Sequence, residues 1–367
     1  MRLKVYFNIL KMNKAIKTCS FLMPGEFEKQ KSVWIVWPHN KKDWPGYFNS
    51  IPGTIANIIS KLSISQKVKL IIQKNGNKNE ISKLLRLRGF KKTNVKFYKI
   101  DTDRIWIRDS GPIYVKNQIT GKKTILNFKF NGWSKYRNFK KDNKIPSKIC
   151  ELTRIKKINP YINYNKKKYY PVLEGGAFDV NGKGSVLLTK ECLLSKKQER
   201  NPGLKKKDYQ LFLGKYLGIK NFIWLNRGIK GDDTHGHIDD ISRFVTKNTI
   251  MTCFETNKKE RNYKILNENL KILKNARDTN GEKFKIIKIP MPKAKYINKV
   301  RVPATYLNFF IGNKVILLPI YNDKKDIKVF KIFKRFFNNR KIITIDCSKL
   351  IWGFGAVHCM TQQEPDI

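Results

Sequence analysis

The chain has 367 residues, and its 77 basic side chains against 28 acidic ones give a formal net charge of +49. At 41% hydrophobic and 12% aromatic residues, it is too apolar for a disordered polycation and long enough to bury a core. Its six cysteines occur singly, which argues against a disulfide framework, a zinc ribbon or an iron–sulfur site and favours a reducing compartment. Lysines interrupt every apolar stretch before it reaches the roughly 20 residues of a membrane span or forms a signal-peptide core. We therefore expect a cytoplasmic protein with no membrane partner.

Short apolar strands alternate with amphipathic helices along the chain. β-branched and aromatic residues predict strands, in chain order, at residues 33–37, 68–73, 95–100, 124–130, 184–189, 221–225, 241–245, 249–253, 284–289, 307–311, 314–318 and 341–345. Apolar residues three and four positions apart predict helices at 51–62, 206–216, 263–274 and 327–337. The lysine- and asparagine-rich segment 135–168 has the weakest pattern. A strand–strand–helix–strand order recurs and no linker divides the chain, so we expect a single α/β domain.

The positive charge has two interpretations. Lysine far outnumbers arginine, with asparagine and isoleucine abundant beside it, as an AT-rich genome tends to encode. The basic residues are spread along the whole chain, whereas a nucleic-acid footprint gathers them on one face or in a tail. We therefore expect no specific nucleic-acid partner, and a non-catalytic polyanion-binding protein stays open as the alternative.

Four segments depart from this background because they are rich in glycine, acidic residues, histidine and tryptophan. They span residues 106–112, 173–179, 231–240 and 352–365. The third holds four acidic residues and two of the four histidines. Mutational drift toward lysine should have replaced these residues unless selection retained them. We therefore expect the catalytic chemistry in these four segments.

A nucleophile and its base require at least one cysteine and one histidine. Here the cysteine is Cys359, in a glycine-rich segment, and the histidine lies elsewhere in the chain. The acids Asp109, Glu174 and Asp239 are unusual neighbours for a thiol whose reaction generates an oxyanion, since an oxyanion needs donors. Carboxylates favour a cationic substrate, and a guanidinium presents a planar fork of N–H donors that a carboxylate accepts. These residues together point to attack on a guanidinium carbon.

Some of these residues also have ordinary structural interpretations. Asp109 suits a turn before Gly111, and Gly175 with Gly176 suits a tight turn or a β-bulge. The five cysteines other than the nucleophile are expected to be small buried apolar groups.

The histidines have alternatives too. His235, His237 and Asp239 alternate along the sequence, so on a strand they share a face and are candidates for metal ligands. That hypothesis requires a further strong ligand. His358, next to the nucleophile, is expected to be structural, and His39 is expected to be a loop residue.

Taken together, the segments resemble the agmatine deiminases, which belong to the guanidine-modifying (pentein) superfamily with bacterial peptidyl-arginine deiminase. The resemblance begins at Met23-Pro24-Gly25-Glu26-Phe27-Glu28 and ends at Glu364-Pro365. Between them it includes residues 34–40, 200–203, 291–292, 303–306 and 358–363. We expect an N-terminal extension at 1–22, outside the resemblance, and a single deiminase domain at 23–367.

The resemblance implies an α/β fold, a five-bladed α/β propeller with pseudo-fivefold symmetry and an active site on its axis. It implies Cys359 as the nucleophile and His237 as the general acid and base. Asp109 and Asp239 match the carboxylates that bind the guanidinium. Glu174 matches the acid that orients the histidine.

The implied reaction is hydrolysis of agmatine to N-carbamoylputrescine and ammonia, a step toward putrescine. It runs through an S-amidino-cysteine on Cys359, without metal or cofactor, and Trp106 is a further expected substrate contact. The partner is therefore a small cationic guanidine. Deimination of arginine or of a C-terminal peptidyl arginine stays open as the alternative. The oligomeric state also stays open, a homo-oligomer included.

Two departures from the family pattern raise the question of activity. Phe354 and Ala356 interrupt Gly353 and Gly355 before the nucleophile, and the loop 131–134 is less glycine-rich than the family pattern. Glycine at such positions permits positive φ and close backbone approach. Since every residue assigned to chemistry is present, we expect an active enzyme.

Overall fold

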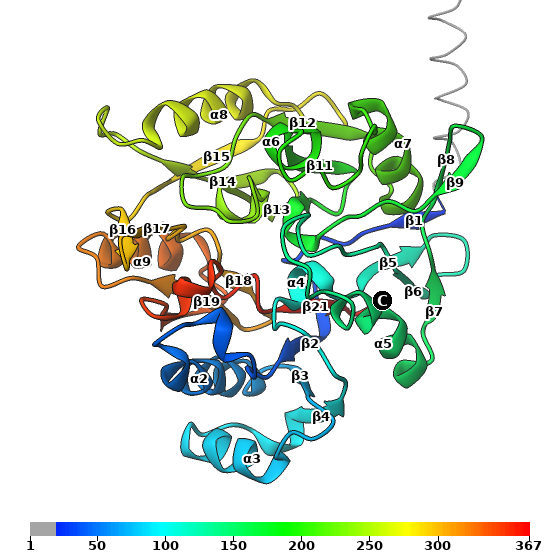
Figure 1. Cartoon of the computed structure of the whole chain (residues 1–367). Helices are drawn as coiled ribbons and strands as arrows, with labels where there is room; N and C mark the ends of the chain where they lie inside the picture. Colours follow the sequence, from blue (N-terminus) through cyan, green and yellow to red (C-terminus); the bar gives the residue numbers. More distant parts are fainter. Residues whose placement is uncertain (1–19) are drawn as a thin grey trace, which may run out of the picture.

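The computed structural model describes residues 20–367 (Figure 1). Within them, five sheets share one internal order, in which an antiparallel strand pair is followed by a parallel neighbour. Sheet by sheet, the strands are β21 Gln362–Pro365, β2 Gln30–Val36, β3 Lys67–Ile72 and β4 Val95–Lys99; β1 Phe21–Leu22, β5 Ile113–Asn117, β6 Lys123–Leu126 and β7 Lys156–Ile158; β10 Phe178–Val180, β11 Ser185–Thr189 and β12 Asn221–Leu225; β13 Ser242–Thr246, β14 Thr249–Phe254 and β15 Lys285–Pro290; β18 Phe310–Ile311, β19 Val315–Ile320 and β20 Lys341–Asp346.

Helices connect the parallel strands of each sheet, because a tight turn cannot join parallel neighbours. The crossover helices are α2 Ile51–Ser63, α3 Lys78–Leu87, α5 Ile145–Thr153, α6 Lys190–Leu194 with α7 Lys206–Leu217, α8 Tyr263–Asn275 and α9 Asp326–Phe336. The other described elements are the helix α4 Ile107–Ser110, the hairpins β8 Ile162–Tyr164 with β9 Lys167–Tyr169 and β16 Lys295–Ile297 with β17 Val300–Val302, and the 3-10 helices η1 Lys41–Asp43, η2 Phe48–Ser50, η3 Lys92–Asn94, η4 Asp142–Lys144, η5 Gly175–Ala177, η6 Ile238–Asp240 and η7 Leu350–Gly353.

Segments far apart in the chain meet in the sheet of β2. There β21 pairs antiparallel with β2, and Trp34 lies opposite Gln362. The five residues from Ser32 to Val36 are all buried, as expected of a strand in a parallel sheet covered on both faces. In Figure 1, β21 and α4 lie near the middle of the molecule with the sheets around them. The last part of the chain is therefore held in the interior.

The predicted elements are largely present, and the fold is mixed α/β as expected. The strand predicted at 124–130 is too long, since β6 ends at Leu126, and the strand at 307–311 is reduced to β18. The weakly patterned segment 135–168 contains α5, β7 and β8. Helix α3 was not predicted, although Ile81, Leu84 and Leu85 follow helical spacing.

The predicted N-terminal extension falls mostly on residues 1–19, outside the described part of the chain. Phe21 and Leu22 form β1, which pairs with Lys116 and Asn117 of β5. The domain boundary after residue 22 stays a prediction.

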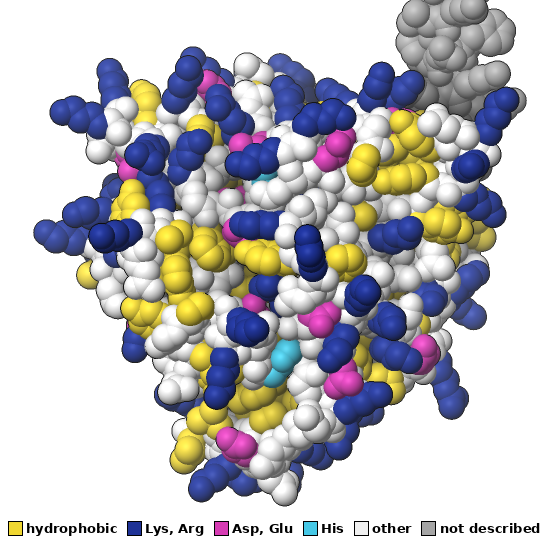
Figure 2. Space-filling view, viewed as in Figure 1, with side chains coloured by type: hydrophobic (Ala, Val, Ile, Leu, Met, Phe, Trp, Pro, Cys, Tyr) yellow, Lys and Arg dark blue, Asp and Glu magenta, His cyan; other side chains and the backbone are white. Residues whose placement is uncertain are grey.

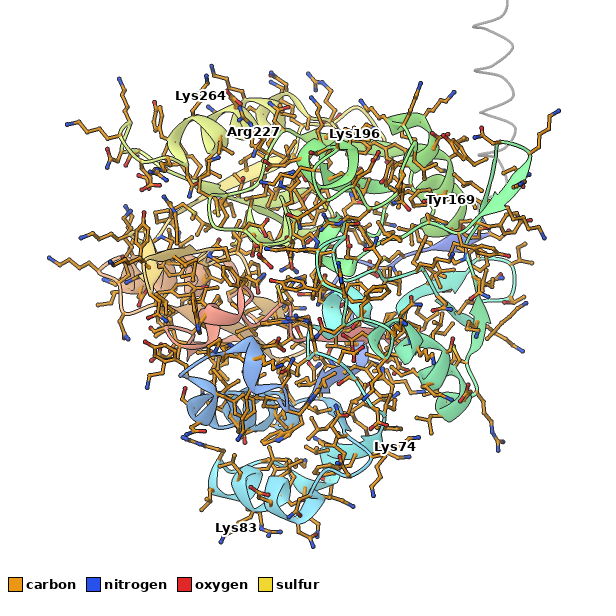
Figure 3. All side chains as sticks on the ribbon, viewed as in Figure 1. Lys74, Lys83, Tyr169, Lys196, Arg227 and Lys264 are labelled. Carbon is orange, nitrogen blue, oxygen red and sulfur yellow. The ribbon has the colours of Figure 1, made fainter. Side chains whose placement is uncertain are left out.

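The basic side chains are distributed over the surface. On the face drawn in Figure 2, Lys and Arg are scattered instead of gathered in one patch, and the labelled Lys83 and Lys264 lie at the periphery in Figure 3. No helix within residues 20–367 has the length and apolar character needed to cross a bilayer.

Candidate active site

Cys359 lies in the turn between η7 and β21. Its carbonyl oxygen accepts a hydrogen bond from the backbone N–H of Arg108 at 3.2 Å, which fixes the turn against α4. The residue is 6% exposed and lines a cavity of about 180 Å³. The cavity is also lined by Lys42, Asp43, Pro45, Arg104, Trp106, Asp109, Trp133, Tyr136, Asp233, Thr234, Trp352, Gly353, Phe354 and Gly355.

The surroundings of the sulfur are acidic. The Sγ atom lies 3.8 Å from Oδ2 of Asp239. Burial raises the pKa of the Cys359 thiol well above its ordinary value, and the charges of Asp239, Asp240 and Asp109 add to the rise. A cation placed among these acids would oppose that rise and favour the thiolate.

The turn before Cys359 accommodates a non-glycine residue with positive φ. A Cβ on Gly355 would lie 2.6 Å from the Trp106 ring and 3.0 Å from the Cβ of Cys359, so this position has no room for a side chain. Phe354, which interrupts the glycines, adopts φ +64°, at a backbone cost of about 1–2 kcal/mol. Its ring packs against Trp352 with 5.8 Å between centroids.

Asp109 in α4 is held by two donors. Nε1 of Trp133 donates to Oδ2 at 3.0 Å, and the backbone N–H of Gly176 donates to Oδ1 at 2.9 Å. A Cβ on Gly176 would lie 2.5 Å from Nδ1 of His237 and 2.8 Å from Oδ1 of Asp109, so only glycine fits between the acid and the imidazole. Burial raises the pKa of Asp109 to about 6.

His237, at the start of η6, is surrounded by three carboxylates. Its Nδ1 lies 3.8 Å from Oδ1 of Asp109 and 3.9 Å from Oδ1 of Asp239, and its Nε2 lies 3.7 Å from Oε2 of Glu174. The side chain is 1% exposed, and neither ring nitrogen has a hydrogen-bond partner in the described part of the chain. Burial would lower the pKa of His237, but Asp109 and the other neighbours raise it well above its ordinary value. This direction favours the imidazolium form, which carries protons that it can transfer.

Glu174 is fixed behind this imidazole by Arg200. Nε of Arg200 donates to Oε1 of Glu174 at 3.1 Å, and the same guanidinium donates to the carbonyl oxygens of Gln198 and Thr234. Burial would raise the pKa of Glu174, but Arg200 and His237 lower it to about 2. Glu174 therefore stays ionised across the neutral range.

A group of possible metal ligands overlaps this site. Glu174, Cys192 and His237 have ligand atoms within 4.8 Å of one another, and sulfur, nitrogen and oxygen together would suit zinc. The guanidinium of Arg200 on Glu174 opposes a divalent cation at this position. His237 and Asp239 lie at the start of a 3-10 helix, so the alternating strand suggested for a metal set is wrong.

Two other histidines lie apart from this group. Nε2 of His235 contacts Oγ of Ser195 at 3.1 Å, and Nε2 of His39 contacts Oγ1 of Thr102 at 2.9 Å. His39 lies in a loop, as predicted.

The comparisons with known proteins agree with this geometry. A family model described as Porphyromonas-type peptidyl-arginine deiminase matches residues 22–365. The chain belongs to this family. A Mycoplasma capricolum protein provisionally named agmatine deiminase is 30% identical, over 97% of this chain and 98% of the relative. Among solved structures, agmatine deiminase of Enterococcus faecalis is 26% identical with a TM-score of 0.82, and a cysteine-to-serine variant of C. jejuni agmatine deiminase with substrate bound is 31% identical with a TM-score of 0.81. Each comparison covers 94% of this chain and 96% of the other.

In this member of the deiminase family, the six predicted site residues converge on one region. Cys359, Asp109 and Trp106 line the cavity, and Trp106 packs on Trp44 with 5.5 Å between ring centroids. The others surround the imidazole beside the cavity. Their catalytic and binding roles remain predictions that the geometry is consistent with.

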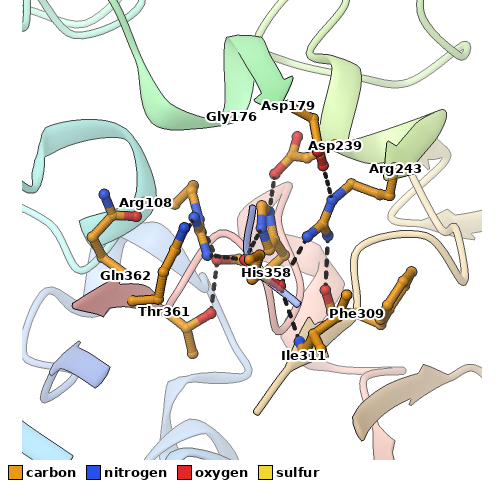
Figure 4. Close-up of polar contacts among 12 residues, drawn as sticks. Arg108, Gly176, Asp179, Asp239, Arg243, Phe309, Ile311, His358, Thr361 and Gln362 are labelled. Atoms are coloured by element: carbon orange, nitrogen blue, oxygen red, sulfur yellow. Dashed lines mark hydrogen bonds and ion pairs between the residues drawn. The ribbon is translucent and has the colours of Figure 1, made fainter. Parts of the chain in front are cut away.

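A second buried histidine lies behind the site (Figure 4). His358 contacts Oδ2 of Asp239 through Nδ1 at 2.7 Å and Oε2 of Glu26 through Nε2 at 2.8 Å. Glu26 also accepts from Arg108 and Arg243, each at 2.8 Å. Figure 4 shows His358 beside Asp239 with Arg243 close by. This network, which we call the Glu26 network, fixes the orientation of Asp239.

Several residues that build the site had no role in the sequence analysis. Arg200 and Glu26 appeared there only as letters of a motif, and Trp133 only in a loop said to be less glycine-rich than the family pattern. Gly176 was given a turn as its ordinary role. Asn308, which contacts Cys359, was not singled out at all, although it follows the quoted residues 303–306.

Proposed function

We propose that the protein hydrolyses agmatine to N-carbamoylputrescine and ammonia, with Cys359 as the nucleophile. The observation that carries this is the clustering of Asp109, Glu174 and Asp239 around one imidazole, with Asp109 and Asp239 also beside a thiol. Such a site attracts a cation, and a guanidinium pairs with carboxylates through parallel N–H donors. Relatives and solved structures named agmatine deiminase support the same substrate.

In the first half of the reaction, Asp109 and Asp239 hold the guanidinium so that its carbon lies against the sulfur. The positive charge among the acids lowers the cost of ionising the thiol, which releases its proton to solvent, and the resulting thiolate attacks this carbon. The imidazolium of His237 donates its proton to the nitrogen that departs as ammonia. A covalent S-amidino-cysteine remains.

In the second half, the neutral imidazole of His237 takes a proton from water. The oxygen of that water attacks the amidino carbon, the carbon–sulfur bond breaks, and the ureido product leaves. Glu174, ionised and fixed by Arg200, stabilises the imidazolium in both halves. The same group therefore acts first as an acid and then as a base.

The mouth of the cavity bears on the choice between agmatine and arginine. Nη1 of Arg104 donates to Oδ1 of Asp43 at 2.6 Å. Asp233 pairs with Lys135 and accepts from the hydroxyl of Tyr136 at 2.7 Å. Because Arg104 and Lys135 are engaged by carboxylates, neither of these two offers a free cation to the carboxylate of an arginine substrate, whereas Lys42, which also lines the cavity, forms no ion pair with a described residue. The acids suit the distal ammonium of agmatine.

Arginine or C-terminal peptidyl arginine is the second candidate, since Arg104 lines the cavity and the family model is described as a peptidyl-arginine deiminase. Incubation of the purified protein with agmatine, arginine and a peptide ending in arginine, followed by an assay for the ureido product, separates the two. We expect agmatine to be turned over fastest and Cys359→Ala to be inactive on all three. Faster turnover of arginine or of the peptide would overturn the choice of agmatine.

The same proposal includes the finer fold and the metabolic role. The strand order repeated in five sheets, with β21 completing the sheet of β2, is consistent with a five-bladed propeller of pseudo-fivefold symmetry. N-carbamoylputrescine is a precursor of putrescine, so the reaction belongs to polyamine synthesis. Sheet axes related by about one fifth of a turn in a crystal structure would support the symmetry.

A further inference from the structure

We propose that Asn308 is a further catalytic residue, whose amide N–H stabilises the thiolate of Cys359 while its carbonyl oxygen fixes the nucleophile turn. This inference rests on the proposed function, because it assigns a role within the same reaction. Asn308 is 0% exposed and lies just before β18. The strand that follows Asn308, β18, belongs to a different sheet from β21, which follows Cys359.

The nitrogen end of Asn308 faces the reacting sulfur. Nδ2 donates to Sγ of Cys359 at 3.0 Å and to Oδ1 of Asp240 at 2.9 Å, with Oδ2 of Asp239 at 3.4 Å. Within residues 20–367, Asn308 is the residue whose side-chain amide lies within hydrogen-bond distance of this sulfur. It therefore supplies a positive dipole end to a sulfur otherwise surrounded by acids.

The oxygen end of Asn308 holds the turn. Oδ1 accepts from the backbone N–H groups of Ala356 at 3.2 Å, His358 at 3.0 Å and Cys359 at 3.3 Å. These contacts also settle which end of the amide is which, because backbone N–H groups only donate and must face the oxygen. The amide nitrogen is left to face the sulfur.

Both ends act on the nucleophile before substrate arrives. The three backbone contacts hold a turn that contains Phe354 at positive φ, so the sulfur has a fixed position. The N–H contact favours a charged sulfur over a neutral thiol, because a hydrogen bond to an ion is about twice as strong as one between neutral groups. Removal of one donor to a developing anion costs about 10²–10³-fold in kcat.

Asn308→Asp separates the two ends, because it keeps an oxygen facing the turn and replaces the donor to sulfur. Asn181→Asp is the matched control. Oδ1 of Asn181 likewise accepts two backbone N–H groups, from Lys183 and Ser185 at 2.9 Å each, and Nδ2 donates to the carbonyl oxygen of Lys247 at 2.8 Å. The control makes the same chemical change in a buried amide that has no recorded contact with sulfur.

The decisive readout is the pH dependence of alkylation of Cys359 by iodoacetamide, followed on the Cys359 peptide by mass spectrometry. In Asn308→Asp we expect the midpoint of alkylation to move to higher pH, and kcat on agmatine to fall about 10²-fold with a smaller change in KM. Asn181→Asp should leave both as in the wild type. An unshifted alkylation midpoint in Asn308→Asp would overturn the proposal.

Asn308→Ala provides a second variant if the aspartate does not fold, and its alkylation midpoint should also rise. The alkylation measurement needs no turnover. Failure of the wild type on agmatine would therefore overturn the proposed function, while the alkylation midpoints test Asn308 on their own.

Discussion

The two buried histidines of the site differ in how their ring nitrogens are satisfied. Both nitrogens of His358 lie 2.7–2.8 Å from carboxylate oxygens. Both nitrogens of His237 lie 3.7–3.9 Å from carboxylates and have no hydrogen bond in the described part of the chain. A satisfied buried group stabilises the fold, whereas an unsatisfied one costs stability and is retained for chemistry. This contrast supports the proposed roles of His358 in the scaffold and His237 in the reaction.

The largest expected effect follows from changing the unsatisfied histidine. His237→Gln should reduce turnover about 10⁴-fold or more, the range seen when a member of a catalytic triad is removed. Its unfolding temperature should fall less than that of His358→Gln, because no hydrogen bond of the ring is lost, although three carboxylates lose a nearby cation. Steady-state kinetics and calorimetry test this, with Cys359→Ser as the inactive reference. A large fall in unfolding temperature would erase the contrast between the two histidines.

His358→Gln should show the reverse: its main effect should be a loss of folding stability. Each buried carboxylate left without its hydrogen-bond partner costs about 1–3 kcal/mol, and both Glu26 and Asp239 lose one here. Denaturant unfolding measures the loss. His39→Gln is the control: one contact to Thr102 in a half-buried loop should cost about 1 kcal/mol. Equal stability of the two variants would contradict the scaffold role.

Asp109→Asn should reduce kcat/KM about 10²–10³-fold, since one carboxylate of the guanidinium site loses its charge. In the wild type, kcat/KM should fall as the pH drops through about 6, because burial raises the pKa of Asp109 to about 6 and protonation removes the charge that binds the cation. This acidic limb should be absent in Asp109→Asn. A pH–rate profile that keeps the limb at the same position would assign it to another group.

Phe354→Gly should have the smallest effect. Glycine relieves the positive φ, worth about 1–2 kcal/mol, but it adds chain entropy of about 0.4–1 kcal/mol to the unfolded state and removes the contact with Trp352. We expect a stability change within about 1 kcal/mol and little change in kcat. A marked gain in kcat would show that Phe354 holds the turn in an unproductive path.

The sequence was enough to predict most strands and the acidic thiol site. Cys359, His237 and the three acids stood out because their segments differ from a lysine-rich background, and the resemblance gave them an order. Helix α3 was missed although Ile81, Leu84 and Leu85 show the spacing of a helical face.

The supporting contacts could not be derived from the sequence, because each joins residues distant along the chain. Glu26 and His358 lie 332 positions apart, and Asn308 and Cys359 lie 51 apart. Neither the periodicity of apolar residues nor the spacing of residues within a motif indicates such a contact. The role of Gly176 likewise depends on His237 and Asp109 approaching it from other segments.

The pairing of β21 with β2 has a consequence for how the protein is made. Ser32 and Glu364 form a hydrogen bond although they are 332 positions apart, and Cys359 lies only a few residues before that strand. During translation, this edge of β2 stays unpaired until residues 362–365 have been synthesised. Because Cys359 lies just before β21, the candidate site cannot assemble before that strand docks.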